Sequence, residues 1–463
     1  MTRNRMRGIG VALVASALAA GGVAAATATA APSGAATVGN FSYGQLQSTT
    51  VGGAGCGTNA AGEPAIHVSR TNNVFLGSEL GVGSGSQFWR GLGALGGAGA
   101  SGCGLEFRGS PNSVVSGVGA SGGDIDIAIA DAKNTSGNYN VYVSSLNLAS
   151  VNVATSTDNG TTFSQTPVQA GLPVDDREWI AAFGAQTSLL TYHDIATNDI
   201  DVLRSDNGGQ LYTQIAQVIP ETDYKAQTNE LGNLVIDHRN LPAGAGNFYA
   251  YQAFVAPSSS SGSNNNEAFL GVSADGGHTW TDQPIPCSTE SPTTDLDHNF
   301  PNVSVDRAGN IWYAWSNDHN IYTAKSTNHG KTWTCSAPVS TNTAQAIFPW
   351  LAATNKGVDL VYYGAPTTAN QTWYVYFAQD TARTTTGWTT PQRLMAVHSG
   401  AVCEGGINCT SGRQLFDDFG VDTDSNGWAH IAFSQDSPSL GGSGTSTGYA
   451  VQTGGTAVGP PNN

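Results

Sequence analysis

The stretch SADGGHTW at residues 273–280 recurs along this chain of 463 residues. Two further copies are STDNGTTF at residues 156–163 and STNHGKTW at residues 326–333, and a shorter one, SDNGG, occupies residues 205–209. A repeat separated by 48, 69 and 53 residues is typical of the blades of a β-propeller. The spacings are counted from the acidic or amide positions Asp158, Asp206, Asp275 and Asn328.

The repeated stretch has the residue types of a tight turn between two strands. Its Asp carboxylate can accept backbone N–H bonds, its glycines tolerate a positive φ, and the aromatic residue that follows can re-enter a sheet. The pattern resembles the Asp-box, or BNR repeat, of the sialidase (neuraminidase) superfamily, S-x-D-x-G-x-T-W. The resemblance implies a propeller whose boxes join the third and fourth strands of a blade, on the face opposite the active site. We therefore expect a structural role at all four positions.

The first 31 residues predict a secretory signal peptide. Arg3, Arg5 and Arg7 precede an uncharged run of small and apolar residues with cleavage-like sites up to Ala31. A retained membrane anchor is the alternative, which the abundance of Ala, Gly and Thr disfavours. Without this leader the chain has 15 basic and 34 acidic residues, a net charge of −19, which disfavours binding to nucleic acid or to an anionic membrane. We expect a secreted, extracellular monomer.

All six cysteines lie beyond the leader, and an even number in an exported chain favours disulfides over a catalytic thiol. Six cysteines allow fifteen connectivities. Two of them are close enough in sequence to close one loop, and two others each follow the aromatic residue of a repeated turn. The predicted pairs are Cys403 with Cys409, Cys287 with Cys335, and Cys56 with Cys103.

Low charge (11% of residues), 59 glycines and the absence of a long helical period predict an all-β chain. Seven segments start an apolar alternation and predict a propeller of seven four-stranded antiparallel blades, with six as the alternative. They are residues 64–68, 126–129, 178–180, 232–236, 301–305, 349–351 and 419–421. A strand within residues 36–48 should complete the last blade and close the ring. Residues 36–455 are expected to form one propeller, and residues 456–463 a disordered tail.

Charged side chains precede or begin these first strands, which in propellers surround the mouth of the central channel. Crowded carboxyl groups raise one another's pKa, so a protonated one can stand beside an ionised one, as glycoside hydrolysis requires. The candidate catalytic residues are Asp176, Arg177, Glu178, Arg413, Asp417 and Asp418. The candidate substrate-binding residues are Glu63, Asp124, Asp126, Trp179, Glu230, His298 and Trp350. Alternatively, the acids bind strand-end amides or a structural Ca²⁺, and the tryptophans pack in the core; no other cofactor is expected.

Three segments around these candidates, DREWIA at residues 176–181, FPW at 348–350 and RQLFDDF at 413–419, resemble secreted bacterial sialidase-like proteins. The resemblance extends over nearly the whole mature chain and implies a propeller of glycosidase ancestry. Sialidases hold the substrate carboxylate with three arginines, the first in a Phe/Tyr-Arg-Ile-Pro motif. The nearest segment here, FRGSP at residues 107–111, departs from that motif, and only Arg177 and Arg413 are expected at the mouth.

Two functions from different classes follow from these features. One is a secreted sialidase-like glycoside hydrolase that acts on extracellular glycans, with exo-alpha-sialidase activity among the candidates. The other is a non-catalytic propeller that binds extracellular glycans or proteins. A metal-stabilised scaffold is a third hypothesis, which chelator-sensitive melting would reveal.

Overall fold

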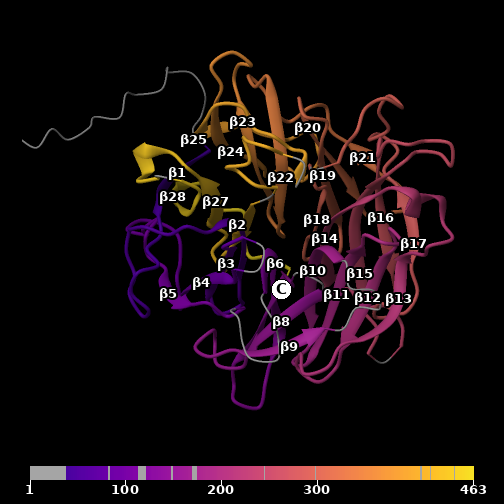
Figure 1. The fold of residues 1–463 in the computed structure, drawn as a ribbon, viewed down its shortest axis with the longest axis horizontal. Coiled ribbons are helices and arrows are strands. Elements are labelled where there is room, and N and C mark those ends of the chain that lie inside the picture. Colours follow the sequence, from indigo (N-terminus) through magenta and orange to yellow (C-terminus); the bar gives the residue numbers. More distant parts are fainter. Residues whose placement is uncertain are drawn as a thin grey trace, which may run out of the picture. The chain divides into compact units, whose positions relative to one another are not determined.

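The computed structural model describes residues 38–81, 84–112, 121–147, 150–168, 175–244, 246–297, 299–406, 409–417, 419–442 and 444–462. Its strands form seven four-stranded antiparallel sheets. The innermost strands contact one another in cyclic order, from β2 through β6, β10, β14, β18 and β22 to β26 and back to β2. The protein is therefore a seven-bladed β-propeller, and Figure 1 shows the blades around their common centre.

Each blade runs from an innermost strand at the channel to an outermost strand at the rim. Blade 1 contains β2 (Gly62–Val68), β3 (Val74–Glu79), β4 (Ser86–Gly91) and β5 (Glu106–Gly109). Blade 2 contains β6 (Ser121–Lys133), β7 (Tyr139–Asn147), β8 (Ser150–Ser156) and β9 (Ser164–Val168). Blade 3 contains β10 (Asp175–Phe183), β11 (Thr187–Asp194), β12 (Ile200–Ser205) and β13 (Thr213–Ile219). Blade 4 contains β14 (Glu230–Asp237), β15 (Tyr249–Ala256), β16 (Glu267–Ser273) and β17 (Thr281–Pro284).

The remaining blades follow the same order. Blade 5 contains β18 (Asn302–Val305), β19 (Ile311–Ser316), β20 (Ile321–Ser326) and β21 (Thr334–Cys335). Blade 6 contains β22 (Gln345–Ala353), β23 (Val358–Ala365), β24 (Thr372–Asp380) and β25 (Gln392–Ser399). Blade 7 contains β26 (Gly420–Thr423), β27 (Ala429–Gln435), β28 (Ser446–Gly455) and, outermost, β1 (Gly39–Gln45). Two short 3-10 helices, η1 (Tyr224–Gln227) and η3 (Pro438–Leu440), lie in connections.

The seven predicted strand starts all lie on or directly before the innermost strands, and the prediction of seven blades is confirmed. β1 pairs antiparallel with β28, so a strand from the beginning of the propeller closes the ring as expected. The expected signal peptide lies outside the described residues. Within the described part of the chain, helices are too short and too polar to cross a membrane.

The repeated turns join the third and fourth strands of blades 2 to 5. In each, the serine that ends the third strand accepts a hydrogen bond from the backbone N–H of a glycine four residues later, at 2.8–3.0 Å. In blade 3 the residue that caps this turn is Asn207, which accepts from the backbone of Gln210 and Leu211. Asp206, the residue expected in that role, instead pairs with Arg204 at 2.9 Å. The predicted capping residue is therefore wrong by one position: the acid Asp206 was expected in this role, and the amide Asn207 that follows it has the role in the structure.

These turns also connect neighbouring blades. A Cβ on Gly277 would lie 3.0 Å from Leu189 of blade 3, and one on Gly160 would lie 2.9 Å from Phe88 of blade 1. Both glycines have a positive φ, 93° and 71°, which favours glycine. The turn glycine is therefore fixed both by its conformation and by the blade packed against it.

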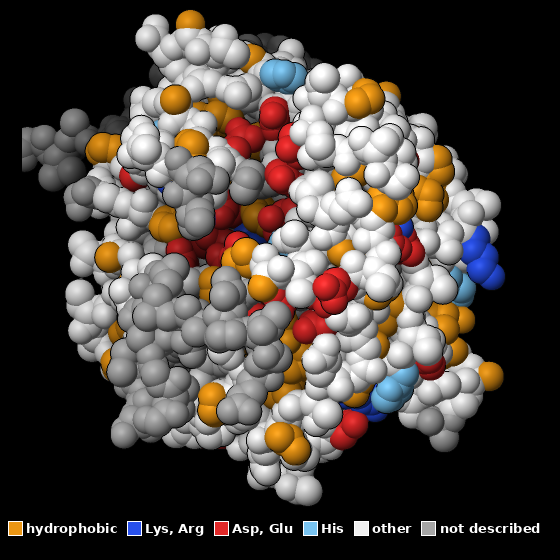
Figure 2. Space-filling model, turned by 45° about the vertical axis from the view of Figure 1, so that its right-hand side comes forward, with side chains coloured by type: hydrophobic (Ala, Val, Ile, Leu, Met, Phe, Trp, Pro, Cys, Tyr) orange, Lys and Arg blue, Asp and Glu red, His pale blue; other side chains and the backbone are white. Residues whose placement is uncertain are grey.

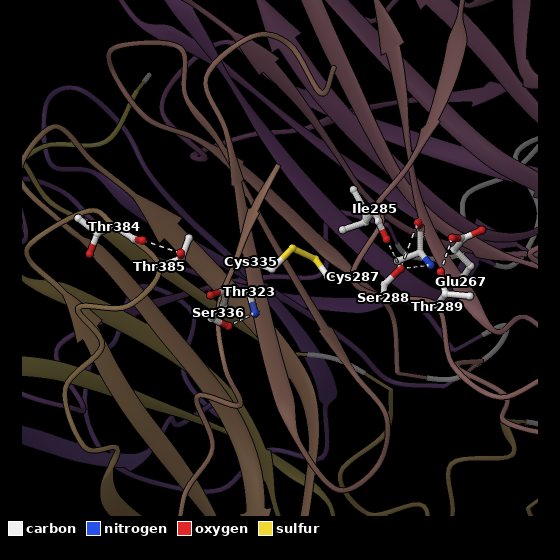
Figure 3. The surroundings of a disulfide bond; sticks show 11 residues. Glu267, Ile285, Cys287, Ser288, Thr289, Thr323, Cys335, Ser336, Thr384 and Thr385 are labelled. Carbon is white, nitrogen blue, oxygen red and sulfur yellow. Dashed lines mark hydrogen bonds between the residues drawn. A yellow bond between two sulfur atoms is a disulfide. The ribbon is translucent and has the colours of Figure 1, made fainter. Parts of the chain in front are cut away.

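The three disulfides have the predicted connectivity: Cys56–Cys103, Cys287–Cys335 and Cys403–Cys409. The bond between Cys287 and Cys335 links the chain after β17 of blade 4 to β21 of blade 5, as Figure 3 shows. Cys403 and Cys409 are six positions apart in the sequence, and their disulfide closes a loop that precedes β26. Part of that loop borders the candidate site described below.

The innermost strands of all seven blades line a central cavity of about 140 Å³, and Pro461 and Asn462 lie at one end of it. Arg307 donates to the carbonyl of Pro461 at 3.4 Å, and Arg239 Nε donates to that of Asn462 at 3.0 Å. Val458 is fully buried. The expectation of a disordered tail over residues 456–463 is therefore wrong for residues 456–462, which pack against the propeller through backbone contacts that their Gly/Pro/Asn composition does not reveal; Asn463 lies outside the described residues.

Candidate functional site

The site lies where the innermost strands begin, at the end of the channel opposite Pro461 and Asn462. Figure 2 shows Asp and Glu side chains gathered in a hollow of the molecular surface. Five of the innermost strands have a β-bulge or register irregularity near their start, and three of these irregularities hold a non-glycine residue with positive φ: Glu63 (51°), Arg177 (50°) and Phe348 (53°). Such a conformation costs about 1–3 kcal/mol and persists where the surrounding structure enforces it.

Arg177 is the buried cation at the centre of the site, with 3% of its side chain exposed. Its Nη1 donates to Oε1 of Glu63, and the same atom lies 3.6 Å from Oδ1 of Asp124. The guanidinium also packs 4.0 Å from the ring centre of Phe300 and 5.2 Å from that of Trp179. Residues of four blades or their connections thus converge on one guanidinium, which forms ion pairs with Glu63 and Asp124.

Asp124 raises the pKa of three neighbouring carboxyl groups. Burial, and then the charge of Asp124, raise the pKa of Glu79 to about 8 and that of Asp176 to about 7. The same two causes hold the pKa of Glu178 well above its usual range. The arrangement therefore places Asp124, the ion-pair partner of Arg177, beside carboxyl groups whose raised pKa favours the protonated form near neutral pH.

Glu178 is the most deeply buried of these acids. Only 1% of the residue is exposed, and neither carboxyl oxygen has a hydrogen-bond partner. A buried charge without a partner would be very costly, so the neutral acid is the stable form. Glu178 lies below the surface of the hollow, whereas Asp124 and Asp176 are partly exposed to it.

A second group of acids borders the site from blade 5 and the loop before blade 7. Asn299 donates from Nδ2 to Asp318 and, at 3.2 Å, to Oε2 of Glu404. Burial and the charge of Asp318 raise the pKa of Glu404 to about 8. Glu404 directly follows Cys403, so the Cys403–Cys409 disulfide restrains the backbone that presents it.

Arg413 and Glu230 complete the set of predicted residues found here. Arg413 forms an ion pair with Asp417 through Nη2, and the charges of Glu63 and Asp124 also raise its pKa, against the effect of burial. Burial and the charge of Asp176 raise the pKa of Glu230 well above its usual range. Eight of the predicted site residues meet at this mouth: Glu63, Asp124, Asp176, Arg177, Glu178, Glu230, Arg413 and Asp417.

Three predicted substrate-binding residues do not reach the hollow. Asp126 is buried on β6, where its Oδ2 accepts from the backbone N–H of Ile180 on β10 at 3.0 Å, so it ties two blades together. Trp179 and Trp350 are 1% and 8% exposed and pack against each other at 5.7 Å between ring centres. Both rings belong to the hydrophobic core. His298 and Asp418 lie outside the described residues.

Three acids of the site, Glu79, Asp318 and Glu404, were not predicted from the sequence. Glu79 ends β3 and pairs with Gly62 at the start of β2. Because neighbouring strands are antiparallel, the last residue of a second strand lies at the same mouth as the first residue of the innermost strand. That rule could have found Glu79, and it also covers Asp318 in the turn after β19; only Glu404 depends on the course of a loop.

Comparisons with known proteins leave the family open. No protein-family model and no curated protein matches the chain. A solved GH74 enzyme from Niastella koreensis is 14% identical with a TM-score of 0.48; the match covers 88% of this chain and 55% of the enzyme, so the chain spans about half its length. A Penicillium chrysogenum alpha-L-arabinanase complexed with arabinobiose is 11% identical with a TM-score of 0.44, and the match covers 90% of this chain and 97% of the arabinanase. A Hadza microbial sialidase is 11% identical with a TM-score of 0.40, and the match covers 65% of this chain and 63% of the sialidase. Likenesses at this level do not identify functional residues.

Proposed function

We propose that this protein is a secreted glycoside hydrolase acting on extracellular glycans, with Asp124 as the ionised carboxylate and Glu79 as the general acid. One observation carries the proposal: Asp124 forms an ion pair with Arg177 at 3.6 Å, while burial and the charge of Asp124 raise the pKa of Glu79 to about 8. Glycoside hydrolysis needs such a pair, one carboxyl to protonate the leaving oxygen and one carboxylate to attack or to activate water. The disulfides and the leader-like N-terminus support secretion.

The substrate that this mouth favours is a neutral sugar. Each of its two arginines already has a carboxylate partner, Glu63 for Arg177 and Asp417 for Arg413. A sialoside would bring a further carboxylate into a hollow where acids outnumber cations, and it would need guanidinium groups to bind it. We therefore expect neutral glycosides to be cleaved in preference to sialosides.

The test is hydrolysis of a panel of fluorogenic glycosides, neutral ones and a sialoside, by the disulfide-bonded protein. Glu79→Gln and Asp124→Asn should each lower kcat by about 10²-fold or more while far-ultraviolet circular dichroism and Tm show a folded protein. Asp206→Asn, at an exposed acid in the turn that joins β12 to β13, is the matched control and should keep full activity.

Three results would contradict parts of this proposal. If the protein hydrolyses no glycoside of the panel but retains polysaccharides in a pull-down, the non-catalytic binding propeller is favoured. Activity that survives both Glu79→Gln and Asp124→Asn would place the chemistry elsewhere. Cleavage of the sialoside alone would overturn the preference for neutral sugars.

A further inference from the structure

A separate cluster of carboxylates lies at the edge of blade 3, away from Arg177 and Arg413. Asp194 ends β11, Asp199 lies in the turn that follows, and Asp201 is the second residue of β12. One oxygen from each lies within 4.8 Å of the others, and the residues are 4%, 5% and 5% exposed. Among the described residues, this is the one group of three acids, histidines or cysteines with that geometry.

A fourth carboxyl group joins this cluster without any partner of its own. Asp175 begins β10 and pairs directly with Asp194 on β11, so both side chains leave the sheet on the same face. Asp175 is 6% exposed, and neither of its carboxyl oxygens accepts or donates a hydrogen bond.

The groups that contact the cluster are neutral. Gln214 donates to Asp201 at 2.6 Å, and Gln217 donates to both Asp201 and Asp199. Further donors are the Tyr192 hydroxyl to Asp201 at 3.1 Å, Thr197 Oγ1 to Asp199 at 2.6 Å and the Ala196 N–H to Asp194 at 2.8 Å. In the described part of the chain, no lysine or arginine forms an ion pair with any of the four acids.

We propose that Asp175, Asp194, Asp199 and Asp201 bind a Ca²⁺ ion. Calcium takes six to eight oxygen ligands at flexible angles, and carboxylates are its usual protein ligands. Asp199 and Asp201 are two residues apart and therefore point to one side, while Asp175 brings two oxygens with no other partner. A divalent cation supplies the positive charge that the cluster lacks among its protein neighbours.

The site has a consequence for the mouth. Asp175 is the residue before Asp176 and two before Arg177, which holds a φ of 50° in the bulge of β10. An ion shared by Asp175 of β10, Asp194 of β11 and Asp201 of β12 would fix the start of β10 to the rest of blade 3. The ion would therefore position Arg177 without contacting a substrate.

Tb³⁺, a luminescent substitute for Ca²⁺, gives a direct binding readout, because the Tyr192 hydroxyl lies 3.1 Å from Asp201 and can sensitise its emission. The protein is first treated with a chelator and dialysed. Tb³⁺ should then bind at one saturable site per molecule and be displaced by Ca²⁺, and Ca²⁺ should raise Tm in a concentration-dependent manner.

Asp199→Asn and Asp194→Asn should each weaken Ca²⁺ binding at least tenfold and remove most of the rise in Tm. The matched control is Asp359→Asn, another fully buried carboxyl but without acidic neighbours, which should bind Ca²⁺ as the wild type does. If one variant does not fold, the other decides. The proposal is overturned if the wild type shows no saturable site, or if folded Asp199→Asn or Asp194→Asn binds Ca²⁺ with unchanged affinity.

Discussion

Asp158 and Asp275 in the repeated turns, and Glu79 and Glu178 at the mouth, are carboxyl groups in opposite surroundings. Burial acts to raise the pKa of Asp275, but hydrogen bonds from Thr279 and Ser273 outweigh it and lower the pKa. At the mouth, burial and the charge of Asp124 act together, and the pKa rises. In the turns, an ionised carboxylate therefore accepts hydrogen bonds that stabilise the backbone. At the mouth, Glu79 and Glu178 instead have a raised pKa beside the charge of Asp124.

The largest expected effect compares the same substitution in the two regions. Asp124→Asn should lower kcat by about 10²–10⁴-fold on any glycoside the wild type cleaves, because it removes the carboxyl group that pairs with Arg177 and that we propose attacks the sugar or activates water. Asp275→Asn should leave kcat within a factor of two or so of the wild type, since it acts on the opposite side of a blade from the hollow. Steady-state kinetics of both folded variants checks this prediction. Equal losses of kcat would contradict the assignment of a catalytic role to Asp124 and a structural role to Asp275.

The next effect concerns stability. Ser273→Ala removes the hydroxyl that accepts from Gly277 N–H at 3.0 Å and donates to Asp275 at 2.9 Å. Because Ser273 is fully buried, the loss should lower the free energy of unfolding by about 1–3 kcal/mol. Glu178→Gln removes a carboxyl that has no hydrogen-bond partner and should cost less.

Denaturant unfolding at pH 7 measures both variants. A larger loss for Glu178→Gln than for Ser273→Ala would contradict the assignment of a neutral, unpartnered Glu178.

The third effect is a pH dependence with a defined sign. The pKa of Glu79 is about 8 in the folded protein, against about 4.5 unfolded, so the folded state binds the proton more tightly. The resulting stability is complete below pH 4.5 and is lost as the pH rises through 8, and each tenfold change in proton affinity corresponds to about 1.4 kcal/mol. Asp124 and Asp417 oppose ionisation of Glu79, while Arg413 and Arg177 favour it. Glu79→Gln should therefore flatten the fall in Tm between pH 6 and pH 9; an unchanged slope would exclude Glu79 as its source.

The smallest effect tests the far end of the channel. Asn462 donates from Nδ2 to Asp237 at 3.3 Å and is 7% exposed. Asn462→Ala should lower the free energy of unfolding by about 1 kcal/mol, the typical contribution of one such bond. Activity should not change, because the mouth lies at the other end. A large loss of kcat with intact Tm would show that the two ends are coupled.

Most of the fold could be predicted from the sequence, because it rests on local patterns. The repeated turns give the blade period, and the apolar alternations give seven strand starts that lie on or directly before the seven innermost strands. The cysteine pairs follow from the same phasing. Residues 456–462 could not be predicted, because their Gly, Pro and Asn content indicates a free tail while their order comes from contacts with Arg239, Arg307 and Thr354 of other blades.

The site was predictable only where its residues start, or shortly precede, an innermost strand. Arg177 and Glu178 were found in this way. Glu79 and Asp318 come from the second strand or the turn after it, and Glu404 from a loop whose course the sequence does not determine. Asp126 and Trp179 were misplaced because, once a strand has entered the sheet, alternation turns its polar and aromatic residues toward neighbouring blades instead of the hollow.

The measurement that tests the central claim most directly is infrared difference spectroscopy of the carboxyl C=O stretch, comparing the wild type with Glu79→Gln at pH 7. We predict a protonated-carboxyl band in the wild type that is missing from Glu79→Gln, is retained in Asp275→Asn, and disappears as the pH rises through about 8. If Glu79→Gln and the wild type give the same band at pH 7, Glu79 is ionised there, and the account of a proton held beside the Asp124 carboxylate is wrong.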